Sequence, residues 1–558
     1  MQFKQSAAAL CLLLFFKTSF AQTTYLPQGA KEAVLLERME IKLGTDSVLN
    51  FSKTKPFSRK QVMGRLNRLD SAGTTLSKTD QYNLYSANVG NLEWAYGNRT
   101  DYASKKGIGK HFYKTPSNLY EVNTNDFFLA VNPVFQYTVG KENNQDQHLF
   151  LNTRGVTLRG RIADKIGFAA YLTDNQERDP LYVQRWEQRF KSVPGQGYYK
   201  NFKKDGYDYF DARGYVTFGV TPYIDVQFGY DKNFIGNGYR SLFLSDFSNN
   251  MLFLKLQTRI WKFNYQNLFM ELNATEPRGG DRLLAKKYAV LHHLDLAVTK
   301  WLNVGLFEGI VLGRKDHFEF GYLNPVIFYR SVEQQNGSFD NAVAGLDAKA
   351  NVAHNFQFYG QLLLDEFKLS EIKAGNGWWA NKFAYQLGAK YIDAFGISNL
   401  DLQTEVNRVR PFTYSHDDSV ANYTHYNQPM AHPLGANFSE WIGLARYQPA
   451  PRWTIEAKAM YYLQGRDVDS ANYGSNIFLP NTPPYRTKEY GFDIGSGVRN
   501  KTALTSFFLS YEIKQNLFLE GNLLFRKESS ASPLLPSGNT VVFSTGIRWN
   551  MHRRTFDF

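Results

Sequence analysis

The sequence predicts an all-β transmembrane barrel of the outer-membrane type, with about 18 antiparallel strands and a small N-terminal periplasmic helical region. Three observations predict this fold: an export signal, segments in which apolar and polar residues alternate with period two, and connections that alternate between short and long. Period-two alternation gives a strand one apolar and one polar face. A barrel wall with lipid outside and a polar lumen inside requires such strands.

The 558-residue chain begins with a pattern typical of a signal peptide. Lys4 supplies a positive charge, residues 7–16 form an apolar core, and residues 19–21 have the small-x-small form of a cleavage site. The apolar run is shorter than the roughly 20 residues that span a bilayer. We therefore expect residues 1–21 to be removed. The single cysteine, Cys11, lies in this peptide, so the exported chain has no disulfide or thiolate chemistry.

The composition favours an exported β protein with anionic surroundings. Aromatic residues make up 16% of the chain, and rings of aromatic side chains at both membrane interfaces are one physical reason for such enrichment. The formal net charge is +13, of which Lys4 and Lys17 leave with the signal peptide. A basic balance fits partners such as the lipid bilayer with its lipopolysaccharide or an acidic glycan. An exported chain without a recognition motif is not expected to bind nucleic acid.

Residues 22–125 show helical rather than alternating patterns. In the stretch 58–70, Val62, Leu66 and Leu69 recur at helical spacing. A second helix begins at Ser77 in a pattern similar to a capping box, with Asp80 three residues later. We expect these helices to lie in the periplasm and to cap the barrel.

Residues 126–558 form the predicted barrel, and the strands in it share the alternating pattern. We expect them near residues 126–138, 149–161, 166–174, 211–220, 224–231, 251–260, 263–272, 288–298, 302–312, 341–352, 355–365, 382–392, 400–409, 437–447, 452–464, 501–513, 517–527 and 540–550. A soluble sandwich also alternates, so this pattern alone does not decide the fold.

The connections between these strands distinguish the two folds. Two or three residues join some strands, as at residues 261–262 and 299–301, whereas the connections between them are long: 175–210, 232–250, 313–340, 366–381, 410–436 and 465–500. Outer-membrane barrels have short periplasmic turns and long surface loops, and an even strand number returns both ends of the chain to the periplasm. Phe558 matches the terminal aromatic residue that such barrels carry for assembly.

Three segments in order resemble the Wzi-like capsule-assembly family of outer-membrane proteins, and most closely its Bacteroidota branch with the gliding-motility-associated RemB-like proteins. They are Ile235-Gly-Asn-Gly-Tyr-Arg-Ser-Leu-Phe-Leu-Ser-Asp246, Asn324-Pro-Val-Ile-Phe-Tyr-Arg330 and Tyr359-Gly-Gln-Leu-Leu-Leu-Asp-Glu-Phe367. The resemblance covers roughly residues 126–558. It implies an eighteen-stranded barrel whose lumen is obstructed by infolded loops, and a lectin that binds capsular or other surface polysaccharide, with motility or export proteins as further partners. It supplies no catalytic residues and no cofactor.

Aromatic rings with neighbouring polar groups are the candidate glycan-binding residues, because rings stack on the apolar faces of sugars. Trp378 and Trp379 follow Asp365 and Glu366 along the chain. Another loop holds three rings, with Arg185 and Arg189 nearby; these rings are Trp186, Tyr198 and Tyr199. The alternative is that the rings form an aromatic girdle or pack the loops together.

The loop 232–250 contains Tyr239, Arg240 and Asp246, which are further glycan candidates. Because a buried charge needs a partner, a structural ion pair of Arg240 with Asp246 or Glu366 is the favoured interpretation. Gly236 and Gly238 permit tight turns in this loop and match no phosphate-binding pattern.

Catalysis and metal binding find little support in the sequence. His292 and His293 are adjacent in a strand, so their rings point to opposite faces and cannot bind one metal ion. Asp365 and Glu366 likewise diverge if the strand is regular, which argues against paired acids of a glycoside hydrolase. The expected function is thus non-catalytic polysaccharide binding. The alternative is an outer-membrane diffusion or solute-uptake channel, because large barrels with polar interiors conduct.

Overall fold

The computed structural model describes residues 23–558 except 70–75, 96–98, 105–110, 144, 164, 275–282, 315, 327, 338 and 469–470. The predicted signal peptide lies outside the described residues. None of the helices in the described part is long and apolar enough to cross a membrane.

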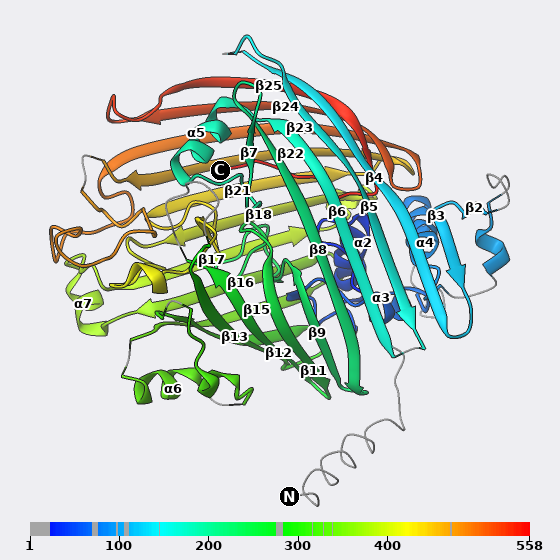
Figure 1. Cartoon of the computed structure of the whole chain (residues 1–558), viewed down its shortest axis with the longest axis horizontal. Helices are drawn as coiled ribbons and strands as arrows, with labels where there is room; N and C mark the ends of the chain where they lie inside the picture. Colours follow the sequence, from blue (N-terminus) through cyan, green and yellow to red (C-terminus); the bar gives the residue numbers. More distant parts are fainter. Residues whose placement is uncertain are drawn as a thin grey trace, which may run out of the picture.

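An antiparallel β-barrel of 18 strands forms the body of the molecule and closes where its last strand pairs with its first (Figure 1). The predicted fold class is confirmed. The strands are β4 (Phe127–Glu142), β5 (Leu149–Ile162), β6 (Ile166–Arg178), β8 (Gly206–Thr221), β9 (Ile224–Asp231), β11 (Met251–Ile260), β12 (Phe263–Asn273), β13 (Lys286–Ala297), β14 (Leu302–Leu312), β15 (Asn341–Val352), β16 (Phe356–Glu366), β17 (Lys382–Tyr391), β18 (Leu400–Val409), β21 (Phe438–Tyr447), β22 (Trp453–Arg466), β23 (Val498–Lys514), β24 (Leu517–Ser530) and β25 (Gly538–Trp549).

Several strands continue past their predicted ends. β6 was expected to end at residue 174 and runs to Arg178, and β8 begins at Gly206 instead of residue 211. These extensions carry polar residues such as Glu177 and Asp208 and pair with each other in register. Beyond the lipid the outward face needs no apolar residues, so the alternating pattern ends before the hydrogen-bonded ladder does.

The long connections hold small elements of their own. Figure 1 shows α5, α6 and α7 at one end of the barrel and α2, α3 and α4 at the other. The long-loop elements are α5 (Leu181–Phe190), β7 (Lys200–Phe202), β10 (Phe234–Ile235), η3 (Phe320–Leu323), α6 (Tyr329–Gln335), α7 (Leu369–Ala374), η5 (Ser419–Ala421), β19 (Thr424–His425) and β20 (Gln428–Pro429), whereas η4 (Ala394–Gly396) lies in the connection between β17 and β18.

The pleat of each strand separates lipid-facing from lumen-facing side chains. In β13, His293 points into the lumen and contacts Asp347 at 2.6 Å, whereas the Nδ1 atom of His292 lies 3.0 Å from the hydroxyl of Tyr265 on the outer face. The two imidazoles therefore diverge, as predicted. On β25, Phe543 and other large apolar residues remain exposed, as a lipid-facing surface requires.

The N-terminal region contains α2 (Lys31–Leu43), α3 (Arg59–Leu66), α4 (Lys78–Gly90) and the short η2 (Arg99–Tyr102). The predicted helix start at Ser77 is confirmed, because its hydroxyl accepts from the N–H of Asp80. Ser58 caps α3 in the same way by accepting from the N–H of Gln61. The expected helical pattern is wrong for residues 112–123. They form a hairpin of β2 (Phe112–Thr115) and β3 (Asn118–Asn123).

The hairpin has a clear physical reason. β25 pairs with β4 only from Phe135 onward, which leaves the first half of β4 with an open edge. β3 pairs with that half, at Val131 opposite Tyr120. An unpaired strand edge presents free N–H and C=O groups, and the hairpin covers them.

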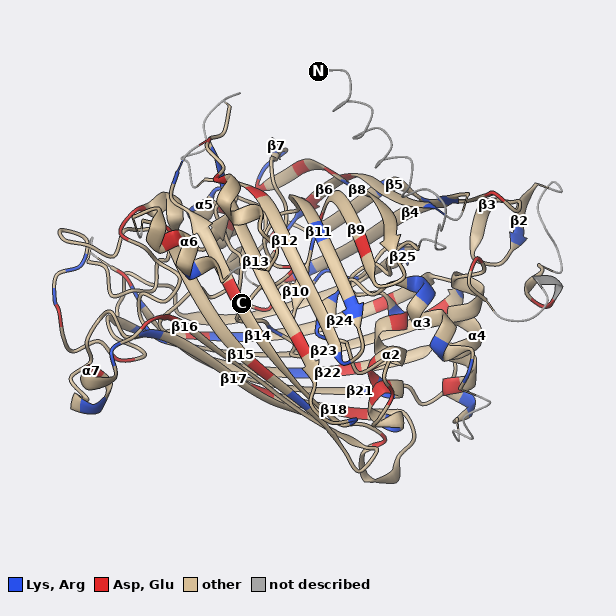
Figure 2. Cartoon of the chain, turned by 90° about the horizontal axis from the view of Figure 1, so that it is seen from below, with Lys and Arg blue, Asp and Glu red and all other residues tan. Residues whose placement is uncertain are grey.

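Buried ion pairs attach α2 to the inner wall at the short-turn end. Arg38 bonds Asp393 at 2.7 Å and also contacts Asp401 and Asp80. Lys349 on β15 bonds Glu40. Figure 2 shows both signs of charge on these helices and on the strand ends beside them. A short strand, β1 (Thr54–Lys55), continues from this region into the lumen.

The loop 232–250, hereafter the plug loop, folds into the lumen. Its β10 pairs with β1, with Thr54 opposite Ile235. Leu242, Phe243 and Leu244 are fully buried against inward residues of the wall, and the ring of Phe243 stacks on that of Phe307 with centroids 4.3 Å apart. The plug loop and the N-terminal region thus meet inside the barrel and fill it.

The segment 550–558 after β25, hereafter the C-terminal tail, also enters the lumen. Figure 1 shows its end inside the barrel near α5. Phe558 packs against Tyr182, Trp186 and Phe247, and the last barrel strand ends at Trp549 instead. Phe558 thus lies outside the final strand, which ends close to its predicted end at residue 550. Eight residues lie between Trp549 and Phe558, and they cross the lumen instead of extending the wall.

Replacing Arg38 by leucine is expected to loosen α2 and α4 from the wall. It leaves the buried carboxylates of Asp80, Asp393 and Asp401 short of a cation, which costs about 3–5 kcal/mol for a broken buried pair. Hydrogen exchange of the α2 and α4 peptides measures the change. Arg68→Leu, an exposed arginine after α3, is the matched control. Equal protection in both variants contradicts the prediction.

The same cluster predicts acid sensitivity. Burial favours a raised pKa for Asp80, but the charges of Arg38 and Lys42 outweigh it and hold that pKa below its usual value. A lowered carboxylate pKa stabilises the fold above the unfolded pKa of about 3.9 and ceases to do so as the pH falls through the folded value. The protection of the α2 amides from hydrogen exchange should therefore be constant from about pH 5 to 7 and decrease below about pH 4. Arg38→Leu should flatten this decrease.

Candidate functional site

Two of the three predicted residues of the plug loop, Tyr239 and Arg240, lie inside the barrel. Arg240 donates to Asp557 at 3.1 Å and to Glu440 at 3.3 Å. The N–H groups of Tyr239 and Arg240 donate to Glu405. Burial opposes the charge of Arg240, but the two carboxylates outweigh it and raise its pKa. These contacts stabilise the plug loop and leave no surface for a glycan.

The expected partners of Arg240 are wrong. Asp246 is exposed, and its backbone carbonyl accepts from Lys232, while Glu366 lies 3.4 Å from Lys382. The actual partners are Glu440 on an inner strand face and Asp557 on the C-terminal tail. Sequence analysis missed Asp557 because no local pattern shows that the tail after the last predicted strand enters the lumen. Lys458, on the polar face of a predicted strand, bonds Asp557 at 2.7 Å.

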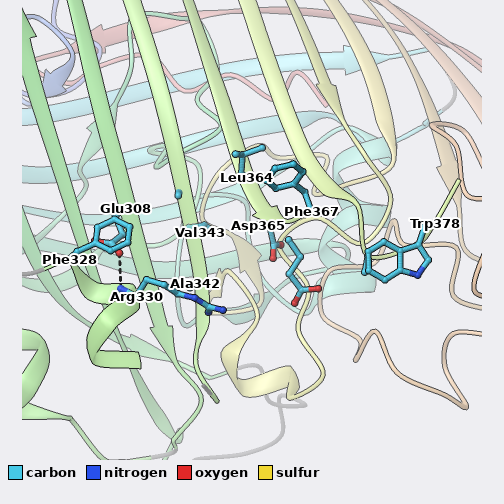
Figure 3. Close-up of a pocket in the computed structure, with 12 residues that line it drawn as sticks. Glu308, Phe328, Arg330, Ala342, Val343, Leu364, Asp365, Phe367 and Trp378 are labelled. Carbon is cyan, nitrogen blue, oxygen red and sulfur yellow. Dashed lines mark hydrogen bonds between the residues drawn. The ribbon is translucent and has the colours of Figure 1, made fainter. Parts of the chain in front are cut away.

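Asp365 and Glu366 lie close together at a cavity of about 450 Å³ on the outer side of the wall (Figure 3). The ladder between β16 and β17 shifts register between Leu364 and Glu366, so both carboxylates approach Lys382, at 3.1 and 3.4 Å. The expectation that adjacent strand residues diverge fails here, because a bulge places two successive residues against one partner. Asp365 is buried and Glu366 half exposed.

The two tryptophans of this loop have different roles. Trp378 lines the cavity with Phe328, Arg330 and the two acids. Trp379 lies behind it, where its indole N–H donates to Glu489 at 2.9 Å and the guanidinium of Arg486 lies 4.1 Å from its ring centroid. Trp379 thus joins two long loops, as the packing interpretation holds, and only Trp378 faces the cavity.

A second cavity, of about 120 Å³, lies at the long-loop end between α5, two further loops and the ends of β22–β24. We call it the arginine groove. α5 begins directly after Pro180, which suits a helix start. Tyr182 and Val183 are buried, while Arg185 and Arg189 are exposed. The groove is lined by Tyr182, Arg185, Trp186, Arg189, Phe190, Pro429, Pro433, Leu434, Gly435, Tyr462, Gln464, Arg466, Ser475, Asn476, Ile477, Phe478, Asn500, Arg526, Glu528, Leu535, Pro536 and Phe558.

Positive charge dominates the arginine groove. Its lining includes four arginines and one carboxylate, Glu528. Glu528 bonds Arg526 at 2.8 Å and lies 3.9 Å from the half-exposed Arg185. Arg189 lies over the ring of Phe190, with 5.0 Å between the guanidinium carbon and the ring centroid. The groove therefore has donors for an anion beside aromatic faces.

Trp186 is the predicted residue that the groove contains. Its ring packs on Phe190 at 4.7 Å and on Phe558 at 5.6 Å between centroids, which holds it at the groove wall. Tyr198 and Tyr199 lie outside the linings of both cavities. Tyr199 packs edge-on against Tyr207 at 4.8 Å, and Tyr198 is half exposed.

Sequence reasoning missed Arg466 and Arg526 as groove residues. Arg526 occupies an inward position of β24, and the alternation of that strand was readable. What the sequence does not show is that inward positions of β22 and β24 lie beside α5, because these elements are hundreds of residues apart along the chain.

No protein-family model and no curated protein matches this sequence. Among solved structures, the fold is similar to that of Wzi, an outer-membrane protein involved in group 1 capsule assembly in Escherichia coli and described as a carbohydrate-binding β-barrel. The TM-score is 0.57 and the identity 14%, over 95% of this chain and 100% of that chain. This likeness concerns the fold. The chain is an outer-membrane β-barrel with a Wzi-like fold.

Outer-membrane channels are more distant neighbours. OprD of Pseudomonas aeruginosa gives a TM-score of 0.43 at 13% identity, over 75% of this chain and 94% of its own. OccAB2 of Acinetobacter baumannii gives 0.41 at 11% identity, over 75% of this chain and 98% of its own. Such likenesses are too weak to bear on function.

Replacing Lys382 by methionine is expected to destabilise the rim of the barrel by about 3–5 kcal/mol, because Asp365 then remains buried without its cation. Urea unfolding of the detergent-folded protein measures the loss. Adding Asp365→Asn should recover part of it, which a packing defect at position 382 does not allow. Lys368→Met, whose ammonium group is mostly exposed beside Glu371, is the control and should cost less than about 1 kcal/mol.

Proposed function

We propose that this outer-membrane barrel is a non-catalytic binding protein for acidic surface polysaccharide, and that the arginine groove holds the glycan. One observation carries the proposal: four arginines, one acidic side chain and several aromatic rings, of which Trp186, Phe190 and Phe478 are partly exposed, line a cavity at the long-loop end. Guanidinium groups bind carboxylates in two-pronged fashion, and rings stack on sugar faces. Carbohydrate binding by the structurally similar Wzi barrel supports the proposal that this barrel binds polysaccharide.

The biological role that follows is retention of polysaccharide at the cell surface. Capsule assembly is the form suggested by the sequence resemblance, and attachment of exopolysaccharide during gliding is the other. Both place the long loops at the surface of a Gram-negative cell and the helical region, residues 22–125, in the periplasm. Motility or export proteins would then meet the barrel from either side.

Binding of polysaccharide extracted from the host bacterium tests the proposal. Arg189→Gln with Arg466→Gln should weaken binding about 10- to 100-fold, since a hydrogen bond to a charged group contributes about 1.5–3 kcal/mol. Trp378→Ala with Trp379→Ala, on the outer cavity, is the matched control and should bind as the wild type does. Titration calorimetry gives both dissociation constants.

Two further binding measurements test whether the ligand is acidic and whether the arginine groove is its site. Polysaccharide whose carboxyl groups have been chemically reduced should lose most of its affinity, and added salt should weaken binding of the native form. If the reduced glycan binds equally well, the acidic character is wrong. If the Trp378 and Trp379 variant loses binding while the arginine variant keeps it, the site is the outer cavity.

Conductance in planar bilayers distinguishes polysaccharide binding from the alternative function, a diffusion or solute-uptake channel. A lumen filled by the plug loop, the N-terminal region and the C-terminal tail should give little conductance in planar bilayers. Arg240→Ala with Asp557→Ala removes the contacts between plug loop and tail and should produce openings. Arg154→Ala, which removes an exposed ion pair with Asp174, should stay closed. Steady conductance of the wild-type protein favours the channel.

A further inference from the structure

Three buried carboxylates meet behind α5, on the side away from the arginine groove. Glu177 is the second-last residue of β6, Asp179 follows it by two residues, and Glu187 lies on the inward face of α5. All three are buried, with exposures of 1%, 6% and 0%. One oxygen from each can be chosen so that all lie within 4.8 Å of one another.

The charges of this cluster are not balanced by the side chains around it. Arg554 of the C-terminal tail bonds Glu177 at 2.8 and 3.2 Å. Asp179 and Glu187 approach each other, and the hydroxyl of Tyr207 faces Glu187. None of these contacts has full hydrogen-bond geometry, so both oxygens of Glu187 and the Oδ2 atom of Asp179 lack a partner by that criterion in the described structure. Three acids therefore face one guanidinium and one neutral hydroxyl. Buried, unsolvated carboxylates of this kind cost several kcal/mol each unless they are neutralised.

The spacing suits a hard divalent cation. Calcium binds oxygen ligands at about 2.3–2.6 Å, so oxygens on one ion lie at most about 5 Å apart, as these do. Two unbalanced negative charges equal the charge of one such ion. The three oxygens without a partner belong to two carboxylates, those of Asp179 and Glu187. The carboxylate of Glu177 has further lone pairs besides those that accept from Arg554. A dissociation constant of about 10⁻⁴–10⁻³ M is enough to hold calcium outside the cell, because extracellular modules bind calcium in this range.

We propose that Glu177, Asp179 and Glu187 form a calcium site that attaches α5 to the barrel wall and to the C-terminal tail. The ion joins the end of β6 to the second half of α5, and Arg554 links the same cluster to the tail. Gln184 Nε2 donates to the carbonyl of Asp179 at 2.6 Å and helps fix the connecting turn. Because α5 also presents Arg185, Trp186 and Arg189, the ion orders one wall of the groove. The site stands independently of the glycan proposal.

Terbium luminescence tests the site directly on the full-length, detergent-folded protein after treatment with EDTA. Tb³⁺ replaces calcium at oxygen sites, and Trp186 lies next to Glu187 in the chain and can sensitise its emission. We expect one saturable Tb³⁺ site that added Ca²⁺ displaces. Glu187→Gln should abolish it. Asp208→Asn, a carboxylate on β8 that accepts from Gln176 and lies outside the trio, should leave it intact.

Limited trypsin cleavage after Arg189 or Lys191 gives an independent readout. When cleavage follows local opening, a ligand bound to the closed form slows it by the factor 1 + [Ca²⁺]/Kd, about tenfold at ten times Kd. Glu187→Gln should show no such protection. In EDTA this variant should resist trypsin at least as well as the wild type, because it removes one of the repelling charges, and so it also reports that α5 has folded.

A shared proton is the competing way to neutralise the cluster. If the wild-type protein in EDTA already resists trypsin as Glu187→Gln does, and neither Ca²⁺ nor Tb³⁺ changes this, the acids hold a proton and the calcium site is wrong. Loss of glycan binding by the arginine variant, with calcium protection of α5 retained, would separate the two proposals from each other.

Discussion

Arg240 is the charge on which the interior of this barrel depends. An 18-strand wall encloses more space than its own inward side chains can fill. The connection 410–436 packs against the plug loop in this space, and three segments meet beside it: the N-terminal region, the plug loop and the C-terminal tail. Arg240 lies on the plug loop and binds Asp557 of the tail and Glu440 of the wall. Without these carboxylates the buried guanidinium would destabilise the folded-in plug loop. One ion-pair network therefore holds both the plug loop and the C-terminal tail in place.

The same packing connects the lumen to the surface. Asp557 is fixed by Arg240 and Lys458, and the next residue, Phe558, packs beneath Trp186. The position of the groove wall is therefore set by contacts within the lumen. At the opposite end, Lys53 binds Asp295 at 3.0 Å and also contacts Asp347, just before β1 joins the plug loop. Both ends of the molecule are linked through the plug loop.

The wall was predictable from the sequence because each strand carries its own signal. The alternation of apolar residues such as Phe383, Tyr385 and Leu387 predicts which face of the strand contacts lipid. In the structure these residues lie on the outward face of the barrel. The cap at Ser77 is local as well. Where a prediction needed only neighbouring residues, the sequence sufficed.

The interior was not predictable in the same way. The partners of Arg240 are Glu440, 200 residues away, and Asp557, 317 residues away on a tail whose place in the lumen no periodicity predicts. The common contact of Asp365 and Glu366 with Lys382 depends on one extra residue in the ladder, which composition does not reveal. Of the site residues, Trp186 could be foreseen as an aromatic residue between arginines, but Arg466 and Arg526 could not, because strand order places them beside α5.

Charge pairing also indicates where ligands belong. Many of the buried cations and carboxylates in the lumen bind one another closely, as Lys458 does Asp557 and Lys349 does Glu40, whereas Lys255 and Lys287 bind neutral oxygen atoms instead. Two regions of the long-loop end depart from this balance. The arginine groove has an excess of guanidinium groups open to solvent, and the cluster behind α5 has an excess of buried carboxylate. These two opposite excesses lie on either face of a single helix, and their charges are the reason for which we propose an acidic glycan at one and a divalent cation at the other.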